Sequence, residues 1–475
     1  MQYSVVNYKM VKENSDFRID GEYYHPSFLD LESKIENLKN EPFGNLVKEI
    51  RCGPFGSTVL KDTYLDDGVI VARPFNLINY SLERGNLVFI DEADLKKGLR
   101  VYQEGDIFFS RVGDVHCGIV PKFDKKITIS PNIIAVKVKK EKVNPYFATI
   151  FFNSKYGFPQ IVRGLKVVAQ PTIQTDLVAK LRIVVPSSGF QEIIENLFVK
   201  SLSLQDNSKF FYSQAEQLLL SELELLEWKP KRTLSFIKNF SNTIESDRFD
   251  AEYFQPKYEE IVEAIKKYKG GFDELGSLVK IKKSVEPGSE AYQENGIPFV
   301  RVSNLSKFEL SDNNQQFISE ELYDELKTHQ PKKGEILLSK DATPGMAYYL
   351  NEETQKMIVS GGILKLKMDS KQILPEYLTL VLNSVIVQKQ IERDAGGSII
   401  NHWRPDQVKA TLIPILKNDK QGEIKALVEK SFNDRKLSKS LLEIAKRGVE
   451  MAIEKDEQEA EKWINSEVDG LVIKI

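Results

Sequence analysis

Apolar residues recur at every seventh position through a long central stretch of the chain, from Phe190 to Trp228. The repeat runs without a break through Phe190, Leu197, Leu204, Phe211, Leu218 and Leu225. No Gly or Pro interrupts the stretch. Such a repeat keeps one seam of a helix facing a partner helix. The pattern predicts a helix roughly 55–60 Å long, which we place within residues 188–229.

A partner of similar length is offered near the end of the chain, from Gly422 to Trp463. This stretch is rich in Lys and Glu and carries apolar residues at helical spacing, among them Leu427, Val428, Leu441, Leu442 and Val449. We therefore predict two long antiparallel helices that form a coiled-coil-like spacer. The alternative is that both helices lie inside one domain.

The rest of the chain contains one pattern twice, with the second copy about 230 residues after the first. Asp20 to Pro26 reads DGEYYHP, and Asp250 to Pro256 reads DAEYFQP. Later landmarks follow in the same order: Gly44–Lys48 matches Gly276–Lys280, Gly105–Arg111 matches Gly334–Lys340, and Ile183–Pro186 matches Thr411–Pro414. We interpret the chain as two copies of one module, residues 1–187 and 230–416, each followed by a long helix, 188–229 and 417–475.

Each module reads as a strand-rich lobe with a few helices, which places the chain in the α+β class. The predicted helices are Pro26–Leu38, Tyr146–Asn153, Pro256–Tyr268 and Glu376–Asn383. The predicted strands are Val69–Ala72, Leu87–Ile90, Asp106–Ser110, Ile133–Val138, Ile297–Val302, Glu335–Ser339 and Gly362–Lys367, with a closing strand at Val468–Ile475.

Charge, cysteine count and hydropathy bear mainly on where in the cell the protein is found. The formal net charge is −3, so nucleic-acid binding would have to come from local basic patches. Two cysteines are too few for a disulfide framework. The N-terminus shows no signal-peptide pattern, and no apolar run is long enough to span a membrane. Together these features favour the cytoplasm.

Strings that resemble catalytic motifs lack the context that the chemistry requires. Asp91–Asp94 spells a helicase box, but no G-x-x-x-x-G-K-[ST] phosphate loop accompanies it. Asn144–Phe147 resembles the target-base loop of amino-methyltransferases, without its second Pro or a Gly-rich loop for the methyl donor. Cys52, His116 and Cys117 do not have zinc-ligand spacing. We predict no catalytic residue, no metal site and no cofactor on this chain.

Polar and basic residues recur in both modules near the ends of predicted strands. Arg and Asn can read guanine and adenine edges with two hydrogen bonds, and Ser and Lys can hold phosphates. The candidate DNA-binding residues are Arg73, Asn76, Ser110, Arg111, Arg163, Lys166, Arg301, Asn304, Ser339, Lys340, Thr343, Arg393, His402 and Arg404. The alternative for any one of them is ordinary solvated surface or packing against a carboxylate.

The order and duplication of these landmarks resemble the specificity (S) subunit of type I restriction–modification systems. The resemblance covers nearly the whole chain. Its most telling pieces are Lys333–Gly345, then Pro375–Leu378 with Leu382–Ser384, and Ile413–Pro414 ahead of a helix. The first module carries the same pattern in looser form, with Val112–Gly118 as a variant turn.

The resemblance implies two target-recognition domains that each read one half of a split, asymmetric site in double-stranded DNA. It implies that partner subunits do the chemistry: two modification subunits carrying S-adenosylmethionine methylate adenine, and restriction subunits use ATP and Mg²⁺. It also implies that the long helices dock the modification subunits, for which the stripe of Phe198, Tyr212 and Leu219 is the candidate surface.

Three alternatives remain open at this point. The chain could be a fused DNA methyltransferase or nuclease, which would require binding of a methyl donor. It could be a non-catalytic tandem interaction scaffold, which salt-dependent DNA affinity would distinguish. It could also be the specificity component of a related two-subunit system.

Overall fold

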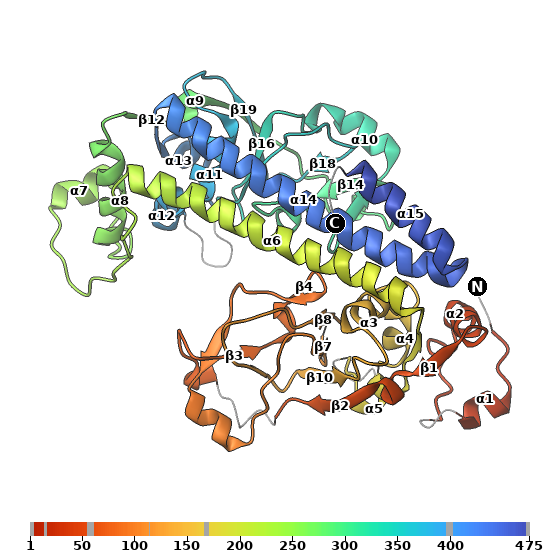
Figure 1. Ribbon diagram of the computed structural model, residues 1–475. Coiled ribbons are helices and arrows are strands. Elements are labelled where there is room, and N and C mark those ends of the chain that lie inside the picture. Colours follow the sequence, from red (N-terminus) through yellow and green to blue (C-terminus); the bar gives the residue numbers. More distant parts are fainter. Residues whose placement is uncertain are drawn as a thin grey trace. The chain divides into compact units, whose positions relative to one another are not determined.

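The computed structural model describes residues 4–13, 17–54, 61–113, 115–165, 171–395 and 402–471. The chain divides into two compact units (Figure 1). The first unit comprises Met1–Leu204 and Lys436–Ile475, and the second comprises Gln205–Arg435. The C-terminal segment thus returns to the first unit. Each predicted module contributes its strands to one unit, and the long helices contribute to both.

The first unit is built on a six-stranded sheet and a three-stranded sheet. The larger sheet has the order β2 (Val47–Cys52), β10 (Ile133–Val138), β7 (Ile107–Ser110), β8 (Cys117–Ile119), β5 (Ser81–Leu82) and β4 (Leu77–Ile78). The smaller sheet has the order β6 (Val88–Ile90), β3 (Val69–Ala72) and β9 (Ile127–Ile129). A two-stranded pair joins β1 (Asn40–Pro42) to β11 (Arg182–Val184).

The second unit repeats this arrangement. Its larger sheet has the order β13 (Val279–Lys283), β19 (Ile363–Met368), β16 (Glu335–Ser339) and β17 (Ala347–Tyr349). Its smaller sheet has the order β15 (Gln316–Ile318), β14 (Ile297–Val300) and β18 (Ile358–Val359). The pair β12 (Phe272–Glu274) and β20 (Leu412–Pro414) corresponds to β1 and β11.

Each strand pair in the sheets of the second unit has the same direction as the matching pair in the first unit. In the smaller sheets, β3 pairs antiparallel with β6 and parallel with β9, and β14 pairs antiparallel with β15 and parallel with β18. In the larger sheets, β10 and β19 each lie between two antiparallel neighbours. The two modules therefore share one topology, which confirms the predicted α+β tandem repeat.

The four shorter helices that were predicted, α2 (Pro26–Glu36), α3 (Pro145–Phe152), α8 (Pro256–Lys267) and α11 (Pro375–Asn383), lie close to their predicted positions, and the remaining short helices were not predicted. The main pairs are α2 with α8, α3 with α11, α4 (Phe158–Arg163) with α12 (Val385–Asp394), and α5 (Thr175–Lys180) with α13 (Pro405–Lys409). The others are α1 (Tyr8–Glu13), α7 (Phe240–Ser246), α9 (Leu275–Leu278) and α10 (Glu320–Leu326). Proline stands in the first turn of α2, α3, α8 and α11, where its missing N–H costs nothing.

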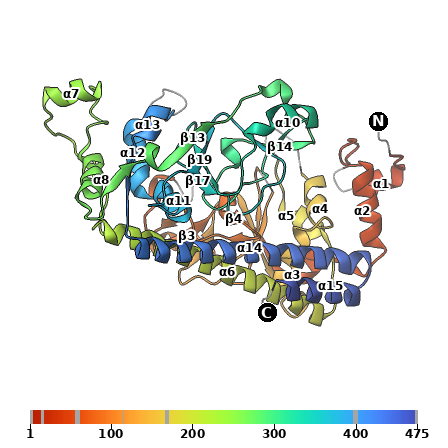
Figure 2. The same cartoon turned by 90° about the horizontal axis from the view of Figure 1, so that it is seen from above.

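The two long helices, α6 (Ser188–Glu222) and α14 (Asn418–Glu454), run side by side (Figures 1 and 2). In the first unit, the hydroxyl of Ser438 donates to the carbonyl of Ser201 at 2.8 Å. In the second unit, the hydroxyl of Ser431 donates to the carbonyl of Ser208 at 2.7 Å. From the first contact to the second, the serine in α6 moves seven positions forward and the serine in α14 moves seven positions back, as antiparallel pairing requires.

Both long helices end earlier than predicted. After α6, Glu224 adopts φ 57° and the N–H of Leu225 bonds to the carbonyl of Leu220 at 2.8 Å, so the chain turns away from the helix axis. After α14, the side chain of Asp456 caps a separate helix, α15 (Glu457–Gly470). The predicted closing strand is wrong over Val468–Gly470, which are helical, and residues 472–475 lie outside the described residues.

The predicted docking stripe of Phe198, Tyr212 and Leu219 is wrong, because all three side chains are buried within their own unit. The ring of Phe198 lies 5.6 Å from that of Tyr146 in the first unit. The ring of Tyr212 lies 4.8 Å from that of Phe308 in the second. These side chains hold α6 on the modules and have no surface left for a partner. In the part of the chain that the structure describes, no helix is both long and apolar enough to cross a membrane.

Candidate nucleic-acid interface

A tight turn follows β3 in the first unit and β14 in the second, and each contains one predicted Arg–Asn pair. The side-chain oxygen of Asn76 accepts from the N–H of Arg73 at 3.1 Å, and that of Asn304 accepts from the N–H of Arg301 at 3.0 Å. Their amide groups donate to the carbonyls of Gly85 and Asn313. Both Asn side chains are about 1% exposed. They hold the turn together, so their predicted role in reading bases is wrong.

The two guanidinium groups of these turns are anchored in the same way. One Nη of Arg73 donates to the carbonyl of Asn86 at 2.8 Å, and one Nη of Arg301 donates to the carbonyl of Asn314 at 2.7 Å. Both Asn86 and Asn314 adopt φ 51°. Arg73 also stacks on the half-exposed ring of Phe75, at 4.6 Å from Cζ to the ring centre. The hydrogen bond to the Asn carbonyl fixes one edge of each guanidinium, and both Arg residues remain partly exposed at the edge of the turn.

Ser110 and Ser339 are buried and close the turns that follow β7 and β16. The hydroxyl oxygen of Ser110 accepts from the N–H of His116 at 2.6 Å, and that of Ser339 accepts from the N–H of Met346 at 2.9 Å. Ser339 also donates to the carbonyl of Thr343 at 2.5 Å. Because both hydroxyls are committed inside the protein, their predicted role as phosphate contacts is wrong.

The next residue in each module, Arg111 or Lys340, ties this turn to the segment ahead of α5 or α13. The carbonyl of Arg111 accepts from the N–H of Ile173 at 3.0 Å. The carbonyl of Lys340 accepts from the N–H of Trp403 at 2.8 Å. Residues that lie about 60 positions apart in the sequence are thereby brought together in both units.

In the second unit this junction gathers a polar cluster, which we define as Lys340, Asp341, Thr343, His402 and Arg404. Asp341 forms an ion pair with Lys340, and its Oδ1 lies 2.8 Å from Nδ1 of His402. The side chains of His402 and Arg404 are 58% and 67% exposed, and Thr343 is also exposed. Asp341, which holds the cluster together, was not among the predicted site residues. Its position directly after Lys340 was the available signal.

The first unit has a different surface at the corresponding junction. Val112 and Thr172 form the bridge that Asp341 and His402 form in the second unit. Arg111 directs a guanidinium nitrogen at the carbonyl of Pro131, 3.4 Å away. Lys166 lies outside the described residues. The two modules therefore present different side chains on the same framework.

Arg163 and Arg393, two of the predicted DNA-binding residues, are partly buried and held by partners within their own modules. Arg163 donates to the carbonyl of Tyr23 and to Glu32, both at 2.8 Å, and its side chain is only 11% exposed. Arg393 pairs with Asp394 at 2.7 Å. Sequence reasoning missed their partners Arg18 and Arg248, which stack on the same tyrosine rings, Tyr23 and Tyr253, at 4.7 and 4.8 Å.

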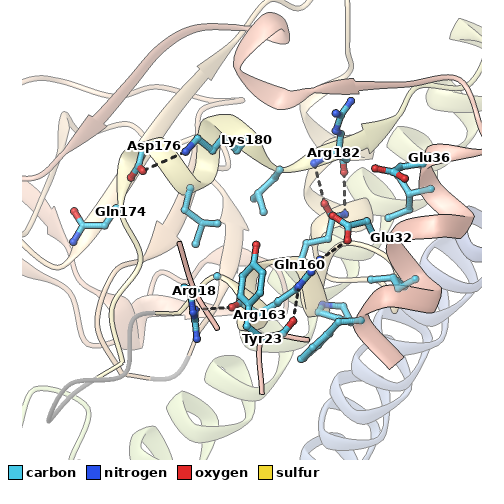
Figure 3. Close-up of a pocket in the computed structure, with 17 residues that line it drawn as sticks. Arg18, Tyr23, Glu32, Glu36, Gln160, Arg163, Gln174, Asp176, Lys180 and Arg182 are labelled. Atoms are coloured by element: carbon cyan, nitrogen blue, oxygen red, sulfur yellow. Dashed lines mark hydrogen bonds and ion pairs between the residues drawn. The ribbon is translucent and has the colours of Figure 1, made fainter. Parts of the chain in front are cut away.

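A cavity of about 410 Å³ lies beside the Arg163 anchor, between α2, α4 and α5. Figure 3 shows its charged groups turned toward one another: Arg163 toward Glu32, and Lys180 toward Asp176. Gln160 also exchanges two hydrogen bonds with the backbone of Arg182, at 2.9 and 3.0 Å. The charged groups named here are paired with one another, and we add none of them to the candidate interface.

The chain is similar to known proteins in both its domain family and its overall sequence. Residues 270–444 match the family described as type I restriction modification DNA specificity domain. The EcoBI specificity subunit of a type I restriction enzyme from Escherichia coli is 20% identical over 383 residues, which are 77% of this chain and 73% of that protein.

Two solved structures are similar at lower identity. The S subunit of a type I restriction-modification system from M. genitalium is 12% identical, with a TM-score of 0.39, and the match covers 92% of this chain and 96% of the other. The HsdS subunit from Thermoanaerobacter tengcongensis is 13% identical, with a TM-score of 0.30, and the match covers 88% and 97%. The chain is thus similar to type I specificity subunits, in the family-model match over residues 270–444 and in the match to the EcoBI subunit over most of its length.

Proposed function

We propose that this chain is the DNA-recognition subunit of a type I restriction–modification complex and that it reads a bipartite, asymmetric site. The observation that carries the proposal is the duplicated framework: two modules of one topology present different side chains at the same junction. The Asp341–His402 pair occupies the place of Val112 and Thr172. Two modules with the same strand topology but different surface side chains would be suited to read two half-sites that differ in sequence.

In the proposed interface, the candidate groups divide into two roles. Arg404 and the Lys340–Asp341–His402 group lie on the second unit, where cationic side chains would contact phosphates. Arg73 and Arg301 each keep one edge bound to a backbone carbonyl, which restrains the guanidinium. A restrained guanidinium suits base reading, because two parallel hydrogen bonds to guanine require a fixed orientation.

The proposed partners follow from the relatives and from the resemblance. Double-stranded DNA would bind the two modules, two modification subunits would supply S-adenosylmethionine and adenine methylation, and restriction subunits would supply ATP- and Mg²⁺-dependent cleavage. This chain would select the site and carry no catalytic residue or cofactor of its own.

The proposal is tested by mapping adenine methylation across the genome with long-read sequencing. Cells would express the neighbouring modification subunit with this chain, without it, or with the chain carrying Arg301→Ala. We expect a split motif that appears only with the chain, and a loss of discrimination confined to one half of that motif in the variant. An active modification subunit that produces the same pattern with and without the chain would refute the proposal.

A further inference from the structure

Two segments of the chain display apolar side chains to solvent to a degree that no other described part matches. Among the described residues, every large apolar side chain that is 60–95% exposed lies in one of these segments. They are Val5, Tyr8, Phe17 and Ile19 in the first, and Leu234, Ile237, Phe240, Ile244 and Phe249 in the second. We call them the first leader (residues 4–13 and 17–20) and the second leader (residues 233–250).

The two leaders occupy the same place in their modules. Each ends on the first residue of the duplicated Asp20–Pro26 or Asp250–Pro256 landmark. Each contains a short helix that starts after an Asn with an exposed aromatic residue: α1 at Tyr8 and α7 at Phe240. Ile19 and Phe249 stand directly before the matched aspartates and are both exposed. The apolar display is therefore a duplicated feature.

Polar anchors hold each leader near both of its ends. In the first unit, the hydroxyl of Ser4 donates to the carbonyl of Tyr24 at 2.5 Å, and Arg18 pairs with Asp20 at 2.7 Å. In the second unit, the side chain of Gln255 bonds to the backbone of Thr233 at 3.0 and 3.1 Å.

At the far end of the second leader, Arg248 pairs with Asp250 at 2.6 Å. No residue of α7 is buried. The leaders are thus fixed by their polar ends while the apolar side chains between them stay outside. Burial of such side chains against a partner removes apolar area from water, so a surface of this kind is typical of a protein-binding site.

We propose that the two leaders are docking sites for two copies of one partner protein, with α1 and α7 each laid in an apolar groove of one copy. This inference rests on the proposed function, because it takes the partner to be the modification subunit. The duplication supports two identical occupants, because one chain that displays the same element twice offers the same protein two equivalent sites. A closed homodimer of this chain would need only one self-complementary surface.

Native mass spectrometry of the full chain with its modification subunit tests the inference. The wild type is expected to give one chain with two modification subunits. The first-leader variant, Val5→Glu with Tyr8→Glu, and the second-leader variant, Ile237→Glu with Phe240→Glu, are each expected to retain one copy. All four substitutions together are expected to retain none. Val101→Glu, which charges an apolar side chain outside both leaders, is the matched control and should keep both copies.

Retention of two copies by the four-substitution variant would overturn the inference and leave the proposed function standing. Loss of self-association in that variant, with both copies retained, would also overturn it and make the leaders a homodimer surface. Failure of the wild type to bind the modification subunit or to direct methylation would instead refute the proposed function. Hydrogen exchange on the wild-type complex gives a second measurement: residues 4–13 and 233–247 should gain protection, and unchanged exchange there would overturn the inference.

Discussion

At each Arg–Asn turn, the amide is an internal part of the turn and the guanidinium lies at its rim. Asn304 accepts one backbone N–H and donates to one carbonyl while it is fully buried. Removing a buried hydrogen-bonding side chain leaves its partners unsatisfied, at a cost of about 1–3 kcal/mol. We therefore expect Asn304→Ala to lower the free energy of unfolding, measured by urea denaturation, by that amount and to leave the methylated motif unchanged. Asn207→Ala on the exposed side of α6 is the control, and a changed motif would contradict the internal role.

Arg404, in contrast to the buried Asn304, is exposed on the surface of the second unit. Its side chain is 67% exposed, and its only described ion pair, with Asp406, spans 3.4 Å. If it contacts a phosphate, Arg404→Ala should weaken binding to all DNA sequences alike and reduce the log–log salt slope by about 1. Titration of the assembled complex at several salt concentrations measures this. Lys269→Ala removes the same charge from an exposed loop of the second unit and should leave the slope unchanged.

Among the elements, α8 and α12 are tied by a cluster around Glu392. Oε1 of Glu392 lies 2.8 Å from Nζ of Lys257 and 3.0 Å from the hydroxyl of Tyr258. Burial works to raise the pKa of Glu392, but hydrogen bonds from Lys257, Lys389 and Tyr258 lower it to about 2. A lowered folded-state pKa stabilises the fold above the unfolded-state pKa, and this contribution is lost as the pH falls through the folded value.

The Glu392→Gln variant tests this linkage through its difference in unfolding stability from the wild type. The variant should be less stable than wild type at pH 7, and the difference should shrink as the pH falls from about 4.5 to about 2. Unfolding midpoints across this range measure the effect. Glu263→Gln, which breaks a fully exposed pair with Lys267, is the control and should show little pH dependence. A constant difference for Glu392→Gln would contradict the linkage.

The long helices approach each other closely where serines face across the seam. Ser208 and Ser431 are fully buried and hydrogen-bonded to one another in the second unit. Ser431→Leu should overpack this contact and cost about 1–3 kcal/mol. Ser431→Ala removes the hydrogen bonds to the hydroxyl and to the carbonyl of Ser208 without overpacking the contact, so it should cost less than Ser431→Leu, which loses the same bonds. Denaturant unfolding of the two variants compares these costs, and an equal effect would argue against a tight seam.

The elements that could be predicted from sequence are those with a complete local pattern. Three predicted strands, Val69–Ala72, Ile133–Val138 and Glu335–Ser339, match the structure residue for residue, because continuous apolar runs are bounded by turn residues. The end of α6 could not be predicted, since Leu223 and Leu225 extend the apolar pattern beyond it. Strands of two residues, such as β4 and β5, carry no periodicity to detect.

The candidate interface was predictable only in part, because residue type does not reveal burial. The duplicated positions were found, and Lys340 and His402 are indeed brought together through Asp341. The same duplication selected Asn76 and Ser339, which recur because both copies of the fold need them inside. A repeated residue can therefore serve the framework or the ligand, and only tertiary contacts separate the two.

At the scale of the whole molecule, the antiparallel helix pair offers a way to change the proposed DNA site without touching either module. Inserting seven residues after Leu204 in α6 and seven after Arg435 in α14 keeps the contacts of Ser201 with Ser438 and of Ser208 with Ser431. The insertion adds about 10 Å to each helix. At 3.4 Å per base pair, we expect the gap in the methylated motif to grow by about three base pairs while both half-sites stay the same.

The matched control inserts seven residues in α6 alone. This moves the apolar seam by one heptad relative to α14 on one side of the insertion, so Ser–Ser contacts on that side cannot form in register. Loss of stability and of a defined motif is then expected. Long-read methylation sequencing measures both variants. An unchanged gap in the double insertion would mean that the helices do not set the half-site separation, even if each module still recognises its own sequence.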